Sequence, residues 1–199
     1  MSAGKVQLGF LFEQDRCMGC HTCQVACKDR NDLPVGQRWR RIIELATGHY
    51  VQSAGVVQPH VSAWYLSMAC NHCARPLCVA NCPTGALHKR AADGLVLIDE
   101  ARCIGCRYCV WSCPYGAPQF DPRRRKVGKC DGCADRLDRG ESPACVDSCP
   151  VRALRFGSIE QLRTEHALSI PRELPSPRIT DPSLVVRPHR DAVDRKVSR

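Results

Sequence analysis

Sixteen cysteines carry the chemistry that this chain of 199 residues can perform. They form four groups of four, and each group begins with the spacing CxxC and ends with CxxxC. Disulfides and core packing require no such regular spacing, whereas thiolates that wrap an iron–sulfur cluster do. The groups are Cys17, Cys20, Cys23 and Cys27; Cys70, Cys73, Cys78 and Cys82; Cys103, Cys106, Cys109 and Cys113; and Cys130, Cys133, Cys145 and Cys149.

The fourth cysteine of each group predicts how the groups combine. Cys109 and Cys113 are four residues apart, which is about 6 Å along a helix, so both sulfurs do not easily reach one compact cluster. In ferredoxins with two clusters and the run C-x2-C-x2-C-x3-C-P, the fourth cysteine binds the other cluster. The helical turn then holds two clusters at a short separation, and the proline that follows three of the groups ends it. Four groups therefore predict two pairs of clusters.

Zinc is the main alternative ligand for such cysteines. Four-cysteine zinc sites use two CxxC knuckles with a spacer between them. Only the fourth group, with its long gap between Cys133 and Cys145, resembles that arrangement. Three cysteines at C-x2-C-x2-C followed by a fourth do not fit a tetrahedral knuckle, so the spacing favours iron–sulfur clusters.

The order of the groups predicts which of them share clusters. The second and third groups are expected to pair, because the chain between them reads as a turn, a loop at Asp93-Gly94 and a strand over Leu95–Asp99. The first and fourth groups are then left to each other. The predicted ligand sets are Cys70, Cys73, Cys78 with Cys113; Cys103, Cys106, Cys109 with Cys82; Cys17, Cys20, Cys23 with Cys149; and Cys130, Cys133, Cys145 with Cys27.

The charge of the chain fits this chemistry better than nucleic-acid binding. The formal charge of +9 assumes neutral thiols. With sixteen thiolates and four cluster cores of about +2 each, it falls to about +1, so the basic excess is interpreted as compensation for anionic clusters. The basic run Arg123–Lys126 follows Asp121-Pro122 and is interpreted as a solvated turn or docking edge, since no aromatic platform accompanies it.

No membrane-spanning or export segment is expected. Apolar runs reach only about five residues, against the roughly 20 that a bilayer requires. The first residues resemble neither a signal peptide nor a twin-arginine leader. Any membrane role is therefore expected to come through a partner, and maturation is expected in the reducing cytoplasm, where clusters are inserted.

The short sequence segments around the cysteines resemble those of a known family. "CIGCRYC", "CPYGAPQ", "KCDGC" and "CPVRALRFG" resemble the four-cluster iron–sulfur subunits of molybdopterin oxidoreductases, and most of all the dimethyl sulfoxide reductase branch. The resemblance covers about Gly9 to Leu162 and recurs in "ITDPSLVVRP". It implies a molybdopterin catalytic subunit and a quinol-oxidising membrane anchor as partners, in a heterotrimer. Electrons would pass from the anchor through four 4Fe–4S clusters to the catalytic subunit, with the third group nearest the quinol and the first nearest the catalytic subunit.

The same resemblance implies an α+β fold made of two bacterial-ferredoxin-like halves, each with two 4Fe–4S clusters. We expect an outer half over residues 1–69 plus 114–170, an inner half over 70–113 and an extended tail over 171–199. The segment Trp39–Leu66 is expected as an insertion that packs across the halves, with strands at Arg40–Leu45 and Val61–Leu66 around a glycine-containing loop.

One cysteine separates branches of the wider family. In nitrate-reductase-type relatives a tryptophan replaces the second cysteine of the third group, whereas this chain has Cys106, so four 4Fe–4S clusters are expected. The favoured function is electron transfer, without catalysis, to a sulfoxide- or N-oxide-type terminal reductase in anaerobic respiration. The alternatives are a free-standing polyferredoxin and the subunit of a polysulfide, thiosulfate or formate-linked enzyme. The resemblance implies peripheral attachment to the inner membrane and leaves open whether the complex is exported folded to the periplasmic face.

Four further side chains lie close to the cysteines in sequence. His21 and His72 sit inside cluster loops, where a hydrogen bond to a cluster sulfur would raise its potential, but exposed histidines are the favoured interpretation. Trp111 and Tyr115 flank Cys113 and are interpreted as packing that keeps water from a cluster, with contact to quinol as the alternative.

Overall fold

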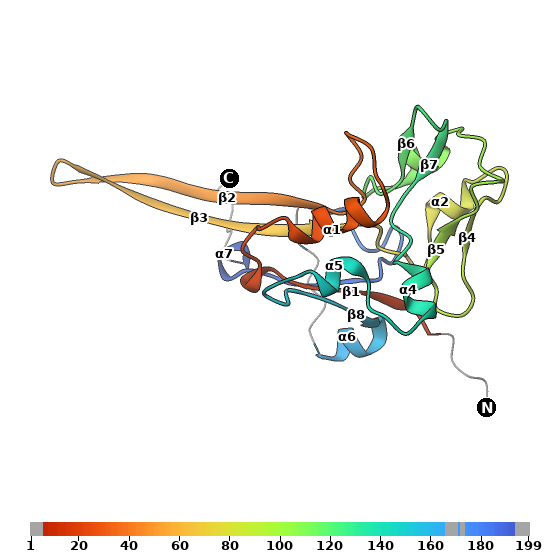
Figure 1. The fold of residues 1–199 in the computed structure, drawn as a ribbon. Coiled ribbons are helices and arrows are strands. Elements are labelled where there is room, and N and C mark those ends of the chain that lie inside the picture. Colours follow the sequence, from red (N-terminus) through yellow and green to blue (C-terminus); the bar gives the residue numbers. More distant parts are fainter. Residues whose placement is uncertain (1–5, 166–170, 172–173, 194–199) are drawn as a thin grey trace.

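The computed structural model describes residues 6–165, 171 and 174–193. The chain forms a body of short helices and strands from which one long hairpin projects (Figure 1). The elements in chain order are β1 (Leu8–Glu13), the 3-10 helix η1 (Gln14–Arg16), α1 (Thr22–Arg30), β2 (Arg41–Ser53), β3 (Val56–Met68), α2 (Leu77–Ala80), β4 (Leu87–Lys89), β5 (Val96–Ile98), α3 (Tyr108–Ser112), β6 (Gln119–Asp121), β7 (Lys126–Gly128), α4 (Ala134–Asp138), α5 (Ala144–Asp147), β8 (Leu154–Ser158), α6 (Ile159–Glu165), β9 (Leu184–Arg187) and α7 (Arg190–Val193).

A three-stranded sheet in the order β8-β1-β9 forms the centre of the body. Residues Leu8–Phe12 of strand β1 form an unbroken apolar run, as expected of a strand whose two faces are both covered. Phe10 and Phe12 face a core that contains several cysteines. Leu11 faces the opposite side, where it packs with Ile159 and Leu162 of α6. The sheet therefore separates the cysteine-rich core from the covering helix.

The end of the chain belongs to this sheet. We expected an extended tail from Pro171 onward, but β9 pairs in parallel with β1 and Val185 and Val186 have no exposed surface. The expectation is wrong for Leu184–Arg187, because three apolar residues show no readable period and their burial depends on the free edge of a strand far away in sequence. Residues 172–173 and 194–199 of the predicted tail lie outside the described part of the chain.

A second core lies between two small hairpins. Strands β4 and β5 pair with each other, as do β6 and β7, and Leu87, Val96 and Val127 from these strands are buried together with several cysteines. We expected the inner half to end at residue 113, but β7 packs into this core through Val127. The hairpin that follows the third cysteine group thus covers the same core as the two strands that precede it.

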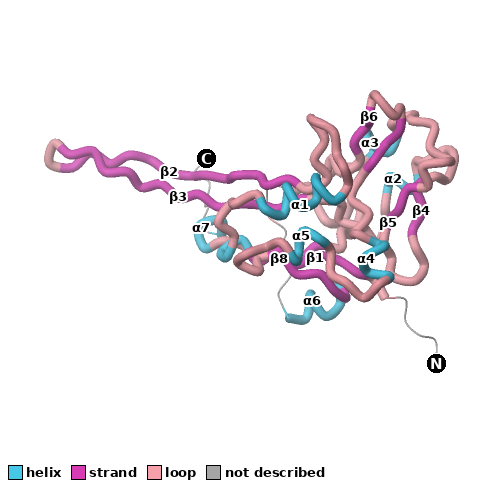
Figure 2. Tube along the Cα trace, in the orientation of Figure 1, coloured by secondary structure: helices cyan, strands magenta, loops and turns pink. Residues whose placement is uncertain are grey.

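The long hairpin is formed by β2 and β3 (Figure 2). The expected strands at Arg40–Leu45 and Val61–Leu66 are present, the first from Arg41 onward, but pairing continues without a break to Ser53 and Val56. Ala54 and Gly55 close the hairpin with positive φ angles of 52° and 79°, as a tight two-residue turn requires.

Pro59 lies within β3, opposite Tyr50 of β2. A two-stranded ribbon leaves one edge of each strand without a partner, so a proline there removes no ladder hydrogen bond. Only the base of the hairpin joins the body, where Trp64, Leu66 and Met68 are buried. Within the described ranges, no helix combines the length and the apolar character that a membrane crossing requires.

Candidate metal centres

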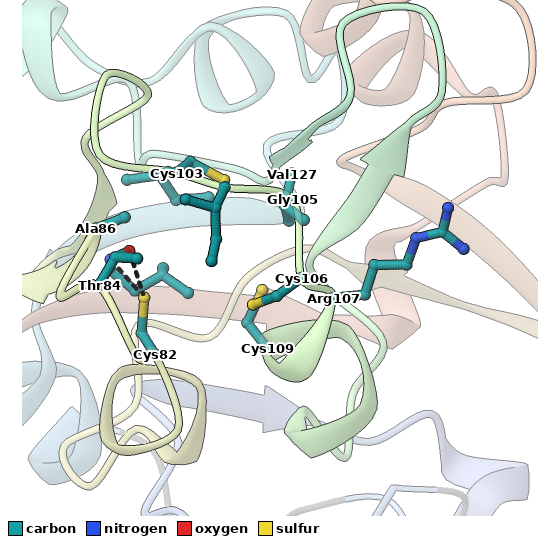
Figure 3. Close-up of a pocket in the computed structure, with 12 residues that line it drawn as sticks. Cys82, Thr84, Ala86, Cys103, Gly105, Cys106, Arg107, Cys109 and Val127 are labelled. Carbon is teal, nitrogen blue, oxygen red and sulfur yellow. Dashed lines mark hydrogen bonds between the residues drawn. The ribbon is translucent and has the colours of Figure 1, made fainter.

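Figure 3 shows a cavity in which cysteines from two groups face one another. Cys103, Cys106 and Cys109 come from the third group. Cys82 comes from the second group and completes the lining. The cavity has a volume of about 330 Å³, and Arg107 points away from it. We call these four cysteines site III.

Two further cavities have the same kind of lining and almost the same size, about 300 and 310 Å³. Each is lined by three cysteines of one group and the last cysteine of another. Site IV consists of Cys130, Cys133, Cys145 and Cys27, and site I consists of Cys17, Cys20, Cys23 and Cys149. Three cavities with the same kind of lining indicate one kind of occupant.

The remaining four cysteines are Cys70, Cys73, Cys78 and Cys113, which we call site II. They lie close enough to act on one another: burial, with the thiolates of Cys70 and Cys113, raises the pKa of Cys73 to about 11. Burial and the same two thiolates raise the pKa of Cys78 to about 12. The structure thus brings together the same sets of cysteines as the spacing predicted, while their binding of clusters remains a prediction.

Short helices link the sites in pairs. Helix α1 carries Cys23 of site I and Cys27 of site IV, and α5 carries Cys145 of site IV just before Cys149 of site I. These two helices pack against each other, and α2 packs in the same way against α3 between sites II and III. The helical turn between the last two cysteines of each group therefore spans from one site to the next.

The four sites form a row in the order III, II, IV, I. The link between the two pairs lies where Cys70 of site II and Cys130 of site IV pack in one buried cluster. Burial raises the pKa of Cys130 well above its usual value, and the Cys27 and Cys70 thiolates add to the effect. Redox groups bound at four such sites would be near neighbours along the whole row.

The loops that carry the first two cysteines of a group require a left-handed residue. Gly105 has a φ of +71°, and a Cβ atom there would lie 2.3 Å from the carbonyl oxygen of Arg125. Gly19 and Gly132 occupy the equivalent positions of the first and fourth groups. The second group has His72 at this position, with a φ of +42°. The loops curl tightly enough to place two sulfurs on one side of a compact group.

Backbone amides donate to the sulfur that ends a group. The Leu87 amide lies 3.4 Å from Cys82 Sγ, and the Ala153 amide lies 3.3 Å from Cys149 Sγ. In both cases a proline follows the cysteine and ends the helical turn, so that the chain bends back toward the sulfur. Such bonds stabilise a thiolate and tune a bound cluster.

Site IV is also lined by buried side chains whose donor nitrogens have no hydrogen-bond partner among the described residues. Arg40 is 2% exposed, and within the described residues its Nε and Nη2 have no hydrogen-bond partner. The indole Nε1 of Trp39 is also buried without a hydrogen-bond partner among these residues. Both Arg40 and Trp39 line the cavity. Buried donors without partners are costly. The cavity therefore suits an occupant with several acceptors, and the sulfurs of an anionic 4Fe–4S cluster meet that requirement.

Two of the four side chains singled out beside the cysteines differ from expectation. His72 is fully buried rather than exposed: its Nδ1 accepts the Val96 amide at 3.0 Å, and its Nε2 lies 3.9 Å from Cys130 Sγ. Trp111 is 73% exposed rather than packed. Tyr115 is buried as expected, and His21 is exposed.

The comparisons with known proteins agree with this arrangement. Residues 61–159 match the model of a 4Fe–4S dicluster domain, and residues 8–29 match that of a 4Fe–4S binding domain. The B subunit of anaerobic dimethyl sulfoxide reductase from Escherichia coli is 49% identical over 184 residues, which cover 92% of this chain and 89% of the relative. Its counterpart in Haemophilus influenzae is 48% identical over 188 residues, covering 94% and 91%. The protein belongs to the family of the dimethyl sulfoxide reductase B subunits, which are 4Fe–4S proteins.

A more distant relative is named for a different reductase. The thiosulfate reductase electron transfer subunit of Salmonella typhi is 40% identical over 157 residues, covering 78% of each protein. Membership of the 4Fe–4S dicluster family excludes the zinc interpretation of the cysteines. The cofactors are 4Fe–4S clusters, and the sixteen cysteines suffice for four of them.

Two residues at the sites were missed or misjudged in the sequence. Arg40 precedes a strand and lies in no motif, so only the packing reveals that it faces site IV. His72 carried a signal that could have been used: it stands where the other three groups have glycine. A histidine in a position that favours glycine requires compensating contacts, and the structure supplies them through Val96 and Cys130.

Proposed function

We propose that this protein is the electron-transfer subunit of an anaerobic respiratory reductase. The observation that carries the proposal is the row of four cysteine sites in a member of the family that includes the B subunit of dimethyl sulfoxide reductase. When bound, 4Fe–4S clusters supply one-electron transfer along that row. The polypeptide supplies the ligands, the spacing and a dry environment, and no catalytic residue.

The ligand sets follow from the sites. We propose that sites I to IV each hold one cluster through their four thiolates, so that each of the four helical turns binds two clusters. Eleven of the cysteines are buried and only Cys20 is exposed. Burial of the sulfurs keeps water away and raises the influence of nearby donors and charges on a cluster.

The two ends of the row suit two different partners. At site III the apolar side chains of Ile104, Tyr108 and Trp111 are all more than half exposed. We assign this end to a membrane anchor that oxidises quinol. At site I, Met18 and Cys20 are exposed, and we assign this end to a molybdopterin catalytic subunit. The three subunits would form a heterotrimer.

The terminal acceptor is set by the catalytic partner. Identity near one half with the dimethyl sulfoxide reductase subunits favours a sulfoxide- or N-oxide-type reductase. Thiosulfate reduction is the second candidate, supported by the Salmonella relative. A free-standing polyferredoxin is the third, and it predicts that the protein purifies without large partners.

The proposal extends to the fold and the location. Sites I and IV with the central sheet would form one ferredoxin-like half, and sites II and III with the small hairpins the other, with β2–β3 as an insertion. We place the complex peripherally at the inner membrane through the anchor. The protein would mature in the cytoplasm, with or without later export in the folded state.

The Cys106→Ser variant tests the function in the whole complex. Loss of one ligand at site III should give a 3Fe–4S or otherwise altered cluster, and quinol-driven reduction of the acceptor should fall by about tenfold or more. Reduction driven by a soluble donor that feeds the catalytic subunit directly should persist. Parallel quinol assays and electron paramagnetic resonance (EPR) spectra measure both effects.

Ala101→Ser is the matched control, because it introduces the same side chain at an exposed position two residues before Cys103. It should retain quinol-driven turnover and normal spectra. Full quinol-driven turnover by the Cys106→Ser complex would contradict the placement of site III between quinol and the other sites. Failure of the protein to purify with large partners would favour the polyferredoxin instead.

A further inference from the structure

Arg40 lies between two of the proposed cluster sites. Its guanidinium lines the cavity of site IV, and its Nη1 donates to Ser67 Oγ at 2.9 Å. Ser67 Oγ in turn lies 3.7 Å from Cys23 Sγ of site I. The Phe10 ring covers the other side, with its centroid 4.6 Å from Arg40 Cζ. The cation is thus held between sites IV and I by one hydrogen bond and one cation–π contact.

The charges around Arg40 come from cysteines. Burial acts to lower the pKa of Arg40, but the thiolates of Cys145, Cys130, Cys23 and Cys27 outweigh it and raise that pKa. Three of these cysteines belong to site IV and one to site I. A fully buried guanidinium with two unpartnered nitrogen atoms is costly unless negative charge lies nearby. The thiolates of these four cysteines, which would bind iron, are the negative groups that act on Arg40, and Asp131 also lines the cavity.

We propose that Arg40 is a buried counter-ion shared by the clusters of sites IV and I, and that it raises both reduction potentials, more at site IV than at site I. Reduction adds one electron to a cluster and makes it more negative by one charge, while its four thiolate ligands stay in place. A fixed positive charge therefore favours the reduced form. The inference depends on the bound clusters and not on which partner the protein serves.

The test is an EPR-monitored redox titration of the complex purified with its clusters, with dithionite as the electron donor. In Arg40→Gln the equilibrium constant for reduction at site IV should fall by about tenfold, which is a negative shift of about 59 mV for one electron. The shift at site I should be smaller and in the same direction. Sites II and III should keep their potentials. In Arg40→Lys, which retains the charge, both shifts should be smaller than in Arg40→Gln.

Arg155→Gln is the matched control. Arg155 lies on β8 in the same half of the molecule, is about half exposed and pairs with Glu165 at 2.8 Å. The substitution removes the same charge, but solvent screens an exposed cation. All four potentials should therefore stay unchanged in this variant.

Every outcome bears on the proposal. Unchanged reduction potentials at sites IV and I in Arg40→Gln, or equal shifts at all four sites, would overturn the proposal. If Arg40→Gln does not assemble its clusters but Arg40→Lys does, the requirement for a buried cation supports it. If neither variant assembles, the role of Arg40 is one of shape rather than charge, and the proposal is wrong. These readouts require no turnover, so they do not depend on the test of Cys106.

Discussion

The loop between Cys70 and Cys73 has histidine where the other three loops have glycine. A left-handed conformation costs a non-glycine residue about 1–2 kcal/mol, and His72 adopts it with a φ of +42°. The imidazole compensates through its contacts with the Val96 amide and Cys130 Sγ. Burial and the nearby Lys129 ammonium hold the pKa of His72 well below its usual value. The ring is therefore neutral, and Nε2 carries the proton that faces the sulfur.

At the residue scale, His72→Gly should be less harmful than His72→Ala. Both variants leave the buried Val96 amide without its acceptor, at a cost of about 1–3 kcal/mol. Glycine also relieves the left-handed strain, which outweighs its larger chain entropy by about 1 kcal/mol. The midpoint of cluster loss in a denaturant titration measures the order. An alanine variant at least as stable as the glycine variant would show that the backbone at His72 carries no strain.

At the element scale, the helices that link the sites and the long hairpin differ in what holds them. Helices α2, α3 and α5 span only four or five residues each, too short to be stable alone. Each is fixed instead by the cysteines at its ends and by the neighbouring helix. The hairpin is fixed by its own ladder, from Arg41 paired with Met68 to Ser53 paired with Val56.

Shortening the hairpin should leave the body intact. Replacing residues 48–61 by Asn-Gly joins Thr47 to Ser62, which already face each other in the same kind of hydrogen-bonded pair as Ser53 and Val56, with a turn that suits a hairpin. The removed residues are almost all exposed, so the free energy of unfolding should change by less than about 1 kcal/mol. Iron content and denaturant unfolding measure the result.

Trp64→Ala at the base of the same hairpin is the contrasting variant. Trp64 is 1% exposed, and its truncation should cost about 3–5 kcal/mol. If the shortened hairpin lost clusters or stability to the same degree as Trp64→Ala, the division between a structural base and a dispensable tip would be contradicted.

At the scale of the whole molecule, three of the cations lie inside the body, beside the cysteine sites. Lys129 is 3% exposed, and its Nζ donates to the Cys130 carbonyl oxygen at 2.9 Å. Lys89 donates in the same way to the Cys73 carbonyl oxygen at 3.0 Å. Together with Arg40, these cations lie beside cysteines of sites II and IV. The Arg123–Arg125 run, by contrast, is an exposed turn.

The sequence predicts the grouping of the cysteines well because ligand spacing is a local property. A helical turn between two cysteines separates their sulfurs wherever it occurs, so the four groups could be read from intervals alone, whereas the pairing of the first group with the fourth followed by elimination. The strand Leu184–Arg187, the full length of the hairpin and the position of Arg40 depend on contacts between residues far apart in the chain. None of these leaves a periodic or spaced signal, and each required the structure.

The central claim is that the last cysteine of a group binds the neighbouring cluster, which places four clusters in a row. EPR spectra of the reduced Cys113→Ser complex, compared with those of Cys78→Ser and Cys109→Ser, test it most directly. Cys113→Ser should alter the same cluster signal as Cys78→Ser, its partner at site II. If it instead altered the signal that Cys109→Ser alters, the third group would bind a single cluster with all four sulfurs, and the crossed arrangement would be wrong.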